Sequence, residues 1–235
     1  MILGMMQPYF YPYLGYWQLM NAVDEYIIYD DVNFIKGGWI HRNRIKINGA
    51  PQYFSLTIRK ASQNKKINEL ELNMDENAKK NLLNKVRSAY GKAPYFKEAF
   101  AVFEKTIACE ETNLASFLAN CNREIAKYLG ITTPIYTCTE LGLDNTLKFQ
   151  ERILDICQSR GYTGYINAIG GKELYGHEPF DAIGCPISFL RMDSDILYPQ
   201  QGSGDFIEGL SILDIMMNNS REEIQEMLKR YTIEQ

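Results

Sequence analysis

Asp30 and Asp31 stand at the end of a short apolar run, residues 25–30, which has the length of a β-strand. Two carboxylates at a strand end can hold Mg²⁺, which proteins bind through one or two carboxylates, or they can orient a hydroxyl or amine of a substrate. They can equally balance the basic loop that follows, since surface ion pairs are common and contribute little to stability. These alternatives stay open at the level of sequence, and both aspartates are taken as candidate catalytic residues.

The chain becomes strongly basic after these aspartates. Residues 32–68 contain eight cations and no Asp or Glu, so the rest of the chain carries a net charge of −12, the total being −4. Such segregation costs self-repulsion unless an anion is held nearby, and it predicts a small, phosphate-bearing ligand. The cations of this basic segment are Lys36, Arg42, Arg44, Lys46, Arg59, Lys60, Lys65 and Lys66.

Residues 36–44 concentrate hydrogen-bond donors within the basic segment. Arg42 and Arg44 can each grip a phosphate or carboxylate through two parallel hydrogen bonds. Lys36 and Asn43 are further candidate ligand contacts. His41 can serve as a general acid or base near neutral pH, or it can be an anion-binding or structural donor.

An aromatic turn precedes both features, with six rings in nine positions around Pro8 and Pro12. Because so many rings cannot all point inward from one turn, we expect a partly exposed platform that stacks on a base or sugar, although aromatic residues are more often part of a core. The rings are Tyr9, Phe10, Tyr11, Tyr13, Tyr16 and Trp17, and the candidate ligand contacts are Gln7, Tyr9, Tyr13 and Tyr16.

A third candidate stretch, residues 167–172, follows an apolar run farther along the chain. Gly170 and Gly171 can expose backbone N–H groups at a helix start and cradle a phosphate, with Lys172 adding charge and Asn167 a polar side chain. An ordinary tight turn explains the two glycines equally well, and neither a Walker sequence nor G-x-G-x-x-G is present.

Strand-length and helix-length segments alternate along the chain, which predicts an α/β fold with a mainly parallel, Rossmann-like sheet. Asn48-Gly49 predicts the turn of a projecting β-hairpin. Helical stripes favour a mostly helical insertion over residues 75–130 within a single domain, residues 1–235. In such a fold ligands bind beyond the carboxyl ends of the strands, where the three candidate stretches fall. Further strands are predicted at residues 134–138, 164–167 and 186–190, and helices at 16–23, 145–160, 210–217 and 220–231. In the helix at 145–160 we expect Phe149, Ile153, Ile156 and Cys157 to face inward, and Ser220 with Glu223 forms a capping box for the last helix.

Composition narrows the class of protein. No apolar run approaches the roughly 20 residues of a membrane helix, and the N-terminus lacks a basic signal-peptide region, so we expect a cytoplasmic protein. The five cysteines are odd in number and contain no C-x-x-C pair, which favours core thiols over disulfides or zinc. Two histidines are too few for a histidine-rich metal site.

Several runs resemble those of the WbqC-like family. They are residues 6–19 (MQPYFYPYLGYWQL), 30–36 (DDVNFIK), 39–45 (WIHRNRI), 169–175 (IGGKELY), 198–200 (YPQ) and 210–214 (LSILD). The resemblance implies a bacterial protein of the kind met in gene clusters for O-antigen and other surface polysaccharides. Residues that match its signature are Gln7, Tyr9, Asp30, Asp31, Lys36, Arg42, Asn43, Arg44, Gly170, Gly171 and Lys172.

A second resemblance concerns Tyr13-Leu-Gly-Tyr16, which lies where nucleotidylyltransferases of the pantothenate synthetase type carry H-x-G-H. Both histidines, which stabilise the phosphate transition state in those enzymes, are tyrosines here. The resemblance therefore implies a nucleotide-binding fold and does not extend to AMP or CMP transfer.

Two functions follow as hypotheses. The first is a transferase that acts on a nucleotide-activated sugar or a similar small anionic intermediate of lipopolysaccharide O-antigen synthesis, moving an acyl, aminoacyl or nucleotidyl group. Mg²⁺ is its candidate cofactor. The second is a non-catalytic binding or scaffold protein that docks an acidic partner or nucleic acid through the basic segment. We favour a small ligand, because the acidic remainder of the chain repels a long polyanion.

Overall fold

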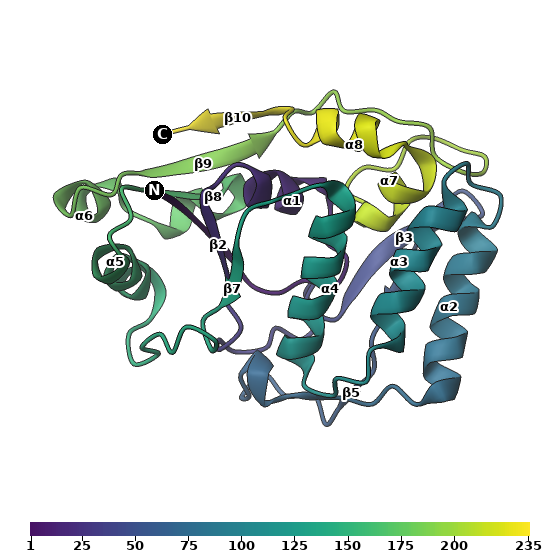
Figure 1. Cartoon of the computed structure of the whole chain (residues 1–235), viewed down its shortest axis with the longest axis horizontal. Helices are drawn as coiled ribbons and strands as arrows, with labels where there is room; N and C mark the ends of the chain where they lie inside the picture. The colour runs from purple at the N-terminus through teal and green to yellow at the C-terminus, as the bar shows by residue number, and fades with distance from the viewer.

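A six-stranded sheet forms the centre of the computed structural model, which describes all 235 residues (Figure 1). Its spatial order is β10-β9-β8-β1-β2-β7, with five parallel strands and β10 antiparallel on one edge. The expected α/β fold with a mainly parallel sheet is confirmed. The strands are β1 (Ile2–Met6), β2 (Glu25–Ile28), β7 (Ile135–Thr137), β8 (Gly164–Ala168), β9 (Ile187–Met192) and β10 (Tyr231–Glu234).

The strand order reverses at β1, because the chain adds β2 and β7 on one side and then β8 and β9 on the other. In open α/β sheets the crevice at such a reversal, beyond the carboxyl ends of the strands, is where ligands bind. Residues directly after Met6, Ile28, Thr137 and Ala168 all lie at that edge. The fold thus brings together stretches that are far apart in the sequence.

Helices cover both faces of the sheet. The strand residues alternate between the faces, so that Tyr26 and Ile28 join the larger core whereas Ile27 joins the smaller one. On the larger-core side lie α1 (Leu14–Asn21), α7 (Ile212–Asn218) and α8 (Arg221–Met227), and on the smaller-core side lie α5 (Phe149–Arg160) and α6 (His177–Ala182).

Three helices fill residues 75–130, as predicted, and stand side by side at the end of the molecule away from α5 and α6 (Figure 1). Asp75 and Asn113 cap two of them by accepting hydrogen bonds from backbone N–H groups, which helix starts leave unpaired. The predicted Ser220 and Glu223 capping box starts α8. The three helices are α2 (Glu76–Tyr90), α3 (Phe96–Ala108) and α4 (Leu114–Leu129).

The predicted β-hairpin consists of β3 (Arg42–Ile47) and β4 (Ala50–Ser55), joined by Asn48 and Gly49 at φ values of 51° and 78°. Its inner face is buried in the core, and residues 197–209, which we call the strap, lie against its turn. Smaller elements complete the chain: β5 (Ile58–Arg59), β6 (Glu71–Leu72) and the 3₁₀ helices η1 (Ile67–Glu69) and η2 (Ile169–Leu174).

Two local predictions need correction. Phe149, expected to point inward from α5, is 84% exposed, and Arg152 takes an inward position instead. The last helix, expected over residues 220–231, ends at Met227, and Tyr231 begins the edge strand β10. The cysteines are free, with four buried and Cys109 half-buried, so they are packed thiols. None of the helices is both long and apolar enough to cross a membrane.

Candidate functional site

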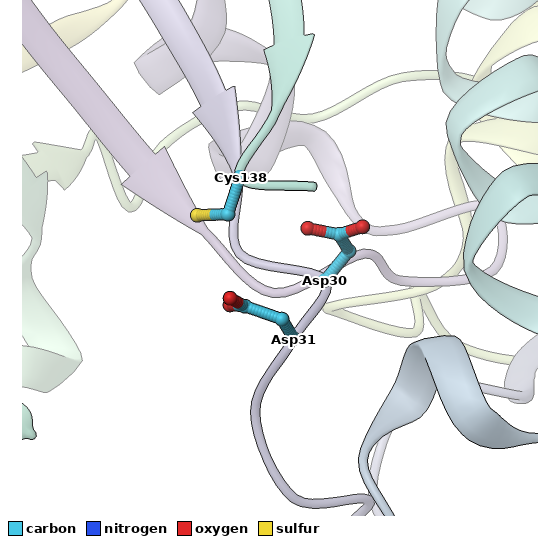
Figure 2. A group of neighbouring side chains, drawn as sticks. All are labelled: Asp30, Asp31 and Cys138. Carbon is cyan, nitrogen blue, oxygen red and sulfur yellow. The ribbon is translucent and has the colours of Figure 1, made fainter. Parts of the chain in front are cut away.

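Asp30, Asp31 and Cys138 meet at the carboxyl ends of β2 and β7 (Figure 2). All three side chains are buried, and one carboxylate oxygen of each aspartate and the Cys138 sulfur lie within 4.8 Å of one another. The Asp31 carboxylate extends toward the same side as the thiol, whereas the Asp30 carboxylate points in another direction (Figure 2). The two adjacent carboxylates therefore have different neighbours.

Asp31 forms an ion pair with Arg152 of α5. The two guanidinium Nη atoms donate to the two carboxylate oxygens over 2.8 and 2.7 Å, and the side chains are only 4% and 2% exposed. The Tyr29 ring lies 4.8 Å from the guanidinium carbon. A buried charge is tolerated only when it is paired and hydrogen-bonded, so this pair fixes the position of α5 relative to β2.

Asp30 is held from one side only. Its Oδ1 accepts a hydrogen bond from the Thr139 backbone N–H over 3.1 Å, and the Asn68 amide donates to the Thr139 hydroxyl over 3.0 Å. No protein donor reaches the second carboxylate oxygen. Burial raises the pKa of Asp30 above its usual value, hydrogen bonds from Thr139 oppose that shift, and the neighbouring Asp31 adds to it. A carboxyl group with a raised pKa and a free oxygen is suited to accept a proton from a substrate.

The three residues do not fit a preformed Mg²⁺ site. Both oxygens of Asp31 are occupied by Arg152, which would have to leave before a cation entered. Burial raises the pKa of the Cys138 thiol strongly, so the sulfur stays protonated, and Mg²⁺ prefers oxygen ligands in any case. One free oxygen of Asp30 remains, and we derive no step through a metal.

The predicted arginines lie on the hairpin. Arg42 donates through Nε to the Gly38 carbonyl over 3.3 Å and through Nη2 to the Gly37 carbonyl. Arg44 donates to the Gly209 carbonyl over 3.4 Å. Lys36 is exposed in the preceding turn. Neither arginine has a carboxylate partner, so both keep uncompensated charge.

Asn43, between the two arginines, has a structural role. It is buried, and its amide donates to the carbonyls of Phe10 and Tyr11 over 3.3 and 2.9 Å. The Phe10 N–H in turn donates to the Trp39 carbonyl over 3.2 Å. These bonds tie the hairpin to the loop after β1, so the basic segment is anchored at the carboxyl edge of the sheet.

The predicted exposed aromatic platform is wrong for most of its rings. Phe10, Tyr11, Tyr16 and Trp17 are completely or almost completely buried, because the loop after β1 is packed between the sheet, the hairpin and the helices. The Tyr16 hydroxyl donates to the Gln7 carbonyl over 3.1 Å, which also ties Gln7 into this packing. Tyr9 and Tyr13 are half-buried and are the two rings of this turn that solvent still reaches.

The remaining candidates are divided between two places. His41 is half-buried 5.4 Å from the Phe34 ring, and burial, with Arg42 beside it, lowers its pKa, so it is neutral at pH 7. Across the reversal point, Asn167 is buried, with its amide donating to the Tyr165 hydroxyl.

Gly170 and Gly171 lie in η2. Lys172 donates to the Gln235 carbonyl over 2.9 Å and to the Glu234 carboxylate over 3.4 Å, so its charge is already paired with the C-terminal segment. This loop lies on the far side of β1 from the aspartates, and the structure brings no part of it into hydrogen-bonding contact with them.

Sequence reasoning missed Arg152, Thr139 and Asn68. A signal for Arg152 was present, since it is a charge one residue before Ile153 and four before Ile156 on the stripe that faces the core. A buried charge needs a partner, and Asp30 and Asp31 are among the acidic residues that follow a strand. Thr139 and Asn68 carry no such signal, because ordinary polar residues in loops are common.

Two surface hollows of the protein lie elsewhere. One, of about 410 Å³, runs from the end of α4 to the start of β7, and the other, of about 270 Å³, lies beside β6 and the start of α2. Neither contains the buried aspartates, Arg152 or the hairpin arginines. We therefore place the candidate site at the carboxyl edge on its chemistry and not on the size of a hollow.

Comparison with known proteins agrees with the resemblance in the sequence. The model of the WbqC-like protein family matches residues 7–226. A protein of Mycobacterium tuberculosis (strain ATCC 25618 / H37Rv), "Uncharacterized protein Rv1507c", is 29% identical over 222 residues, which cover 93% of this chain and 94% of that protein. No solved structure matches the chain. Because the family model spans nearly the whole chain, from the aromatic turn to the last helix, the chain belongs to the WbqC-like protein family.

Proposed function

We propose that this protein is a transferase that acts on a nucleotide-activated sugar or a similar small, phosphate-bearing intermediate of bacterial surface-polysaccharide synthesis. The observation that carries the proposal is Asp30, a buried carboxyl group with a raised pKa and one unpaired oxygen at the carboxyl end of β2. The family resemblance supplies the biological setting, and we place the reaction in the cytoplasm, where activated sugars are made.

Asp30 acts as a general base in this proposal. The acceptor hydroxyl or amine donates its proton to the free oxygen of Asp30 while its oxygen or nitrogen forms the new bond, and the donor's leaving group departs as an anion. The Thr139 N–H holds the other oxygen, so the carboxylate keeps its direction during the transfer. Transfer of an acyl, an aminoacyl or a nucleotidyl group to a hydroxyl or an amine can use such a base.

Asp31 and Arg152 position this base. Their ion pair engages both oxygens of Asp31, so Asp31 does not compete with Asp30 for the acceptor. The free charges of Arg42 and Arg44 are the groups we assign to the anionic donor, because Lys172 is already engaged by the C-terminal strand.

The proposal is tested by incubating the purified protein with nucleotide-sugars and acyl-CoAs in the presence of amine and hydroxyl acceptors, with products detected by mass spectrometry. A thermal-shift screen selects the donors first, since a ligand at 100 times its Kd adds about 2.7 kcal/mol of stability. Asp30→Asn should slow turnover by about 10²- to 10⁴-fold, the usual contribution of a general base.

Asp155→Asn is the matched control, because Asp155 is exposed on the same helix as Arg152 and its replacement should leave turnover unchanged. Turnover that survives Asp30→Asn would remove Asp30 from the reaction.

A non-catalytic binding protein is the second candidate, favoured by the unpaired arginines of the hairpin. In that case no donor is consumed in the transferase assay. An acidic protein or an oligonucleotide then binds with an affinity that falls steeply as the salt concentration rises, whereas the affinity of a small ligand that meets one or two cations depends only weakly on salt.

A further inference from the structure

Two exposed rings lie on the outer side of the hairpin. Trp39, in the turn before β3, and Tyr53, in β4, are 40% and 46% exposed, with ring centroids 6.3 Å apart and planes inclined by 34°. Exposed aromatic side chains that gather in one place mark a binding surface more often than single ones do. A pair of neighbouring exposed rings is therefore present on the hairpin and not in the turn at residues 9–17.

Each of these rings lies under an arginine. The guanidinium carbon of Arg42 is 4.3 Å from the Tyr53 centroid, and that of Arg44 is 5.5 Å from the Trp39 centroid. These contacts hold the planar guanidinium groups beside the rings at little loss of side-chain freedom. The four residues, Trp39, Arg42, Arg44 and Tyr53, form what we call the hairpin platform.

The arginines of the hairpin platform lack an anion. Both donate to main-chain carbonyls of glycines, and the Nε of Arg44 is buried with no partner at all. By contrast Arg59, in the same basic segment, pairs with Glu71 over 3.5 Å. Since residues 32–68 contain no Asp or Glu, the segment itself supplies no carboxylate to the platform. An anionic ligand would complete its charge.

We infer that the hairpin platform binds a nucleoside diphosphate, with the base on the exposed part of Trp39 or Tyr53 and the phosphates on Arg44 and Arg42. Bases stack on aromatic side chains whatever their sequence, and guanidinium groups grip phosphate through paired hydrogen bonds. The inference rests on the proposed function, because the nucleotide would be the activating part of the donor. It adds a location, on the hairpin, for that part.

A nucleotide fits this surface better than a long polyanion does. The rest of the chain carries a net charge of −12, so a nucleic acid that extends beyond the platform meets repulsion. A nucleoside diphosphate carries one base and one anionic group, which match the exposed rings and the arginines of the hairpin platform.

The chain provides its own probe for this binding. It contains two tryptophans, of which Trp17 is buried and Trp39 is exposed, so a ligand on the hairpin platform changes the fluorescence of Trp39. UDP and ADP are the probes, with uridine as a ring without phosphate and pyrophosphate as phosphate without a ring. Both diphosphates should bind at least tenfold more tightly than either fragment. Equal affinity for pyrophosphate and UDP would contradict a role for the rings.

Variants locate the site, with affinity measured by calorimetry because one of them removes the probe. Arg44→Ala should weaken UDP binding about 10- to 100-fold, the effect of losing a charged hydrogen bond. Trp39→Ala should weaken it about 5- to 100-fold, the effect of losing one stacked base. Arg59→Ala is the control, because it removes a cation of the same segment whose charge is already paired, and it should leave binding unchanged. An equal loss in Arg59→Ala and Arg44→Ala, or no loss in Trp39→Ala, would overturn the inference.

The same variants separate this inference from the proposed function. UDP binding that depends on Trp39 and Arg44 without any turnover keeps the platform and removes the transferase. Turnover whose KM for the donor is unaffected by Trp39→Ala and Arg44→Ala keeps the transferase and removes the platform. Tight, steeply salt-dependent binding of a twelve-nucleotide single strand with no UDP binding would overturn the inference and favour a nucleic-acid partner.

Discussion

Asp30 and Asp214 are both buried aspartates with a raised pKa, and burial is the main cause in each case. They differ in their partners. The two oxygens of Asp214, in α7, accept hydrogen bonds from the Tyr90 and Tyr198 hydroxyls over 2.6 and 2.8 Å. Asp30 is held at one oxygen only. A carboxyl group with both oxygens satisfied joins parts of the fold, whereas one with a free oxygen can still take part in chemistry.

Asp214 and the buried charge next to it both have hydrogen-bonding partners within the protein. Lys46 of the hairpin is buried nearby and donates to the Asp205 carbonyl of the strap over 3.1 Å. Asp214 therefore connects α2, α7, the strap and, through Lys46, the hairpin. At the sheet edge, both carboxylate oxygens of Asp31 are satisfied in the same way by Arg152, and Asp30 takes no part in that pair. The comparison predicts where substitutions harm stability and where they harm activity.

The largest effect on stability is expected from Arg152→Ala. It leaves the Asp31 charge buried without a partner, and the free energy of unfolding should fall by about 3 to 5 kcal/mol. Urea unfolding monitored by circular dichroism measures it. Arg59→Ala, which breaks an exposed ion pair with Glu71, should cost less than about 1 kcal/mol. Similar losses in the two variants would mean that the buried pair of Asp31 and Arg152 contributes no more to stability than an exposed ion pair does.

The next largest effect separates the two aspartates directly. Asp214→Ala leaves two tyrosine hydroxyls without their acceptor and should lower the free energy of unfolding by about 2 to 4 kcal/mol at pH 7. Asp30→Ala removes one acceptor from a partly accessible N–H and should cost about 1 kcal/mol or less. Both are measured by urea unfolding. A loss in Asp30→Ala as large as that in Asp214→Ala would make Asp30 a structural residue.

The general architecture was predictable because it depends on local signals. Short apolar runs, the Asn48-Gly49 turn and the Ser220 capping box each act over a few residues, and all appear as predicted. The position of the aspartates at the carboxyl edge followed from the rule that governs parallel sheets. The edge strand β10 was not predictable, since residues 231–234 pair with β9 only after the rest of the sheet is in place.

The details of the site depend on contacts between distant residues, which single-sequence patterns do not encode. Arg152 meets Asp31 across 121 positions, and Tyr198 meets Asp214 only because the strap folds back. The two signature runs at residues 198–200 and 210–214 thus have a shared structural role that neither reveals alone. The aromatic turn was misjudged for the same reason, because the hairpin and the helices that cover it come from elsewhere in the chain.

A smaller effect concerns the pH dependence of stability. The pKa of Asp214 in the folded protein is raised above its usual 3.8, so its contribution is complete below pH 3.8 and is lost as the pH rises through the raised value. The stability of the wild type minus that of Asp214→Asn should therefore fall as the pH increases from 4 to 8. The fall is about 1.4 kcal/mol for each tenfold weakening of the acid.

Urea unfolding across this pH range gives the difference, with Asp155→Asn as a reference for an exposed aspartate. A difference that grows with pH would mean that the hydrogen bonds of Asp214, and not its burial, dominate its pKa.

The smallest effect tests whether the strap holds Tyr198 in its hydrogen bond with Asp214. A Cβ on Gly49 would lie 2.7 Å from the Ser203 carbonyl oxygen of the strap, whereas Gly142, also at positive φ, has open space around it. Both alanine variants carry the strain of a positive φ, so Gly49→Ala should cost about 1 kcal/mol more than Gly142→Ala. If the strap is displaced, Tyr198 loses its bond to Asp214, and Tyr198→Phe should then cost less in Gly49→Ala than in the wild type. Urea unfolding of the wild type, the two single variants and the double variant measures this coupling. Strictly additive losses would show that the bond between Tyr198 and Asp214 does not depend on the position of the strap.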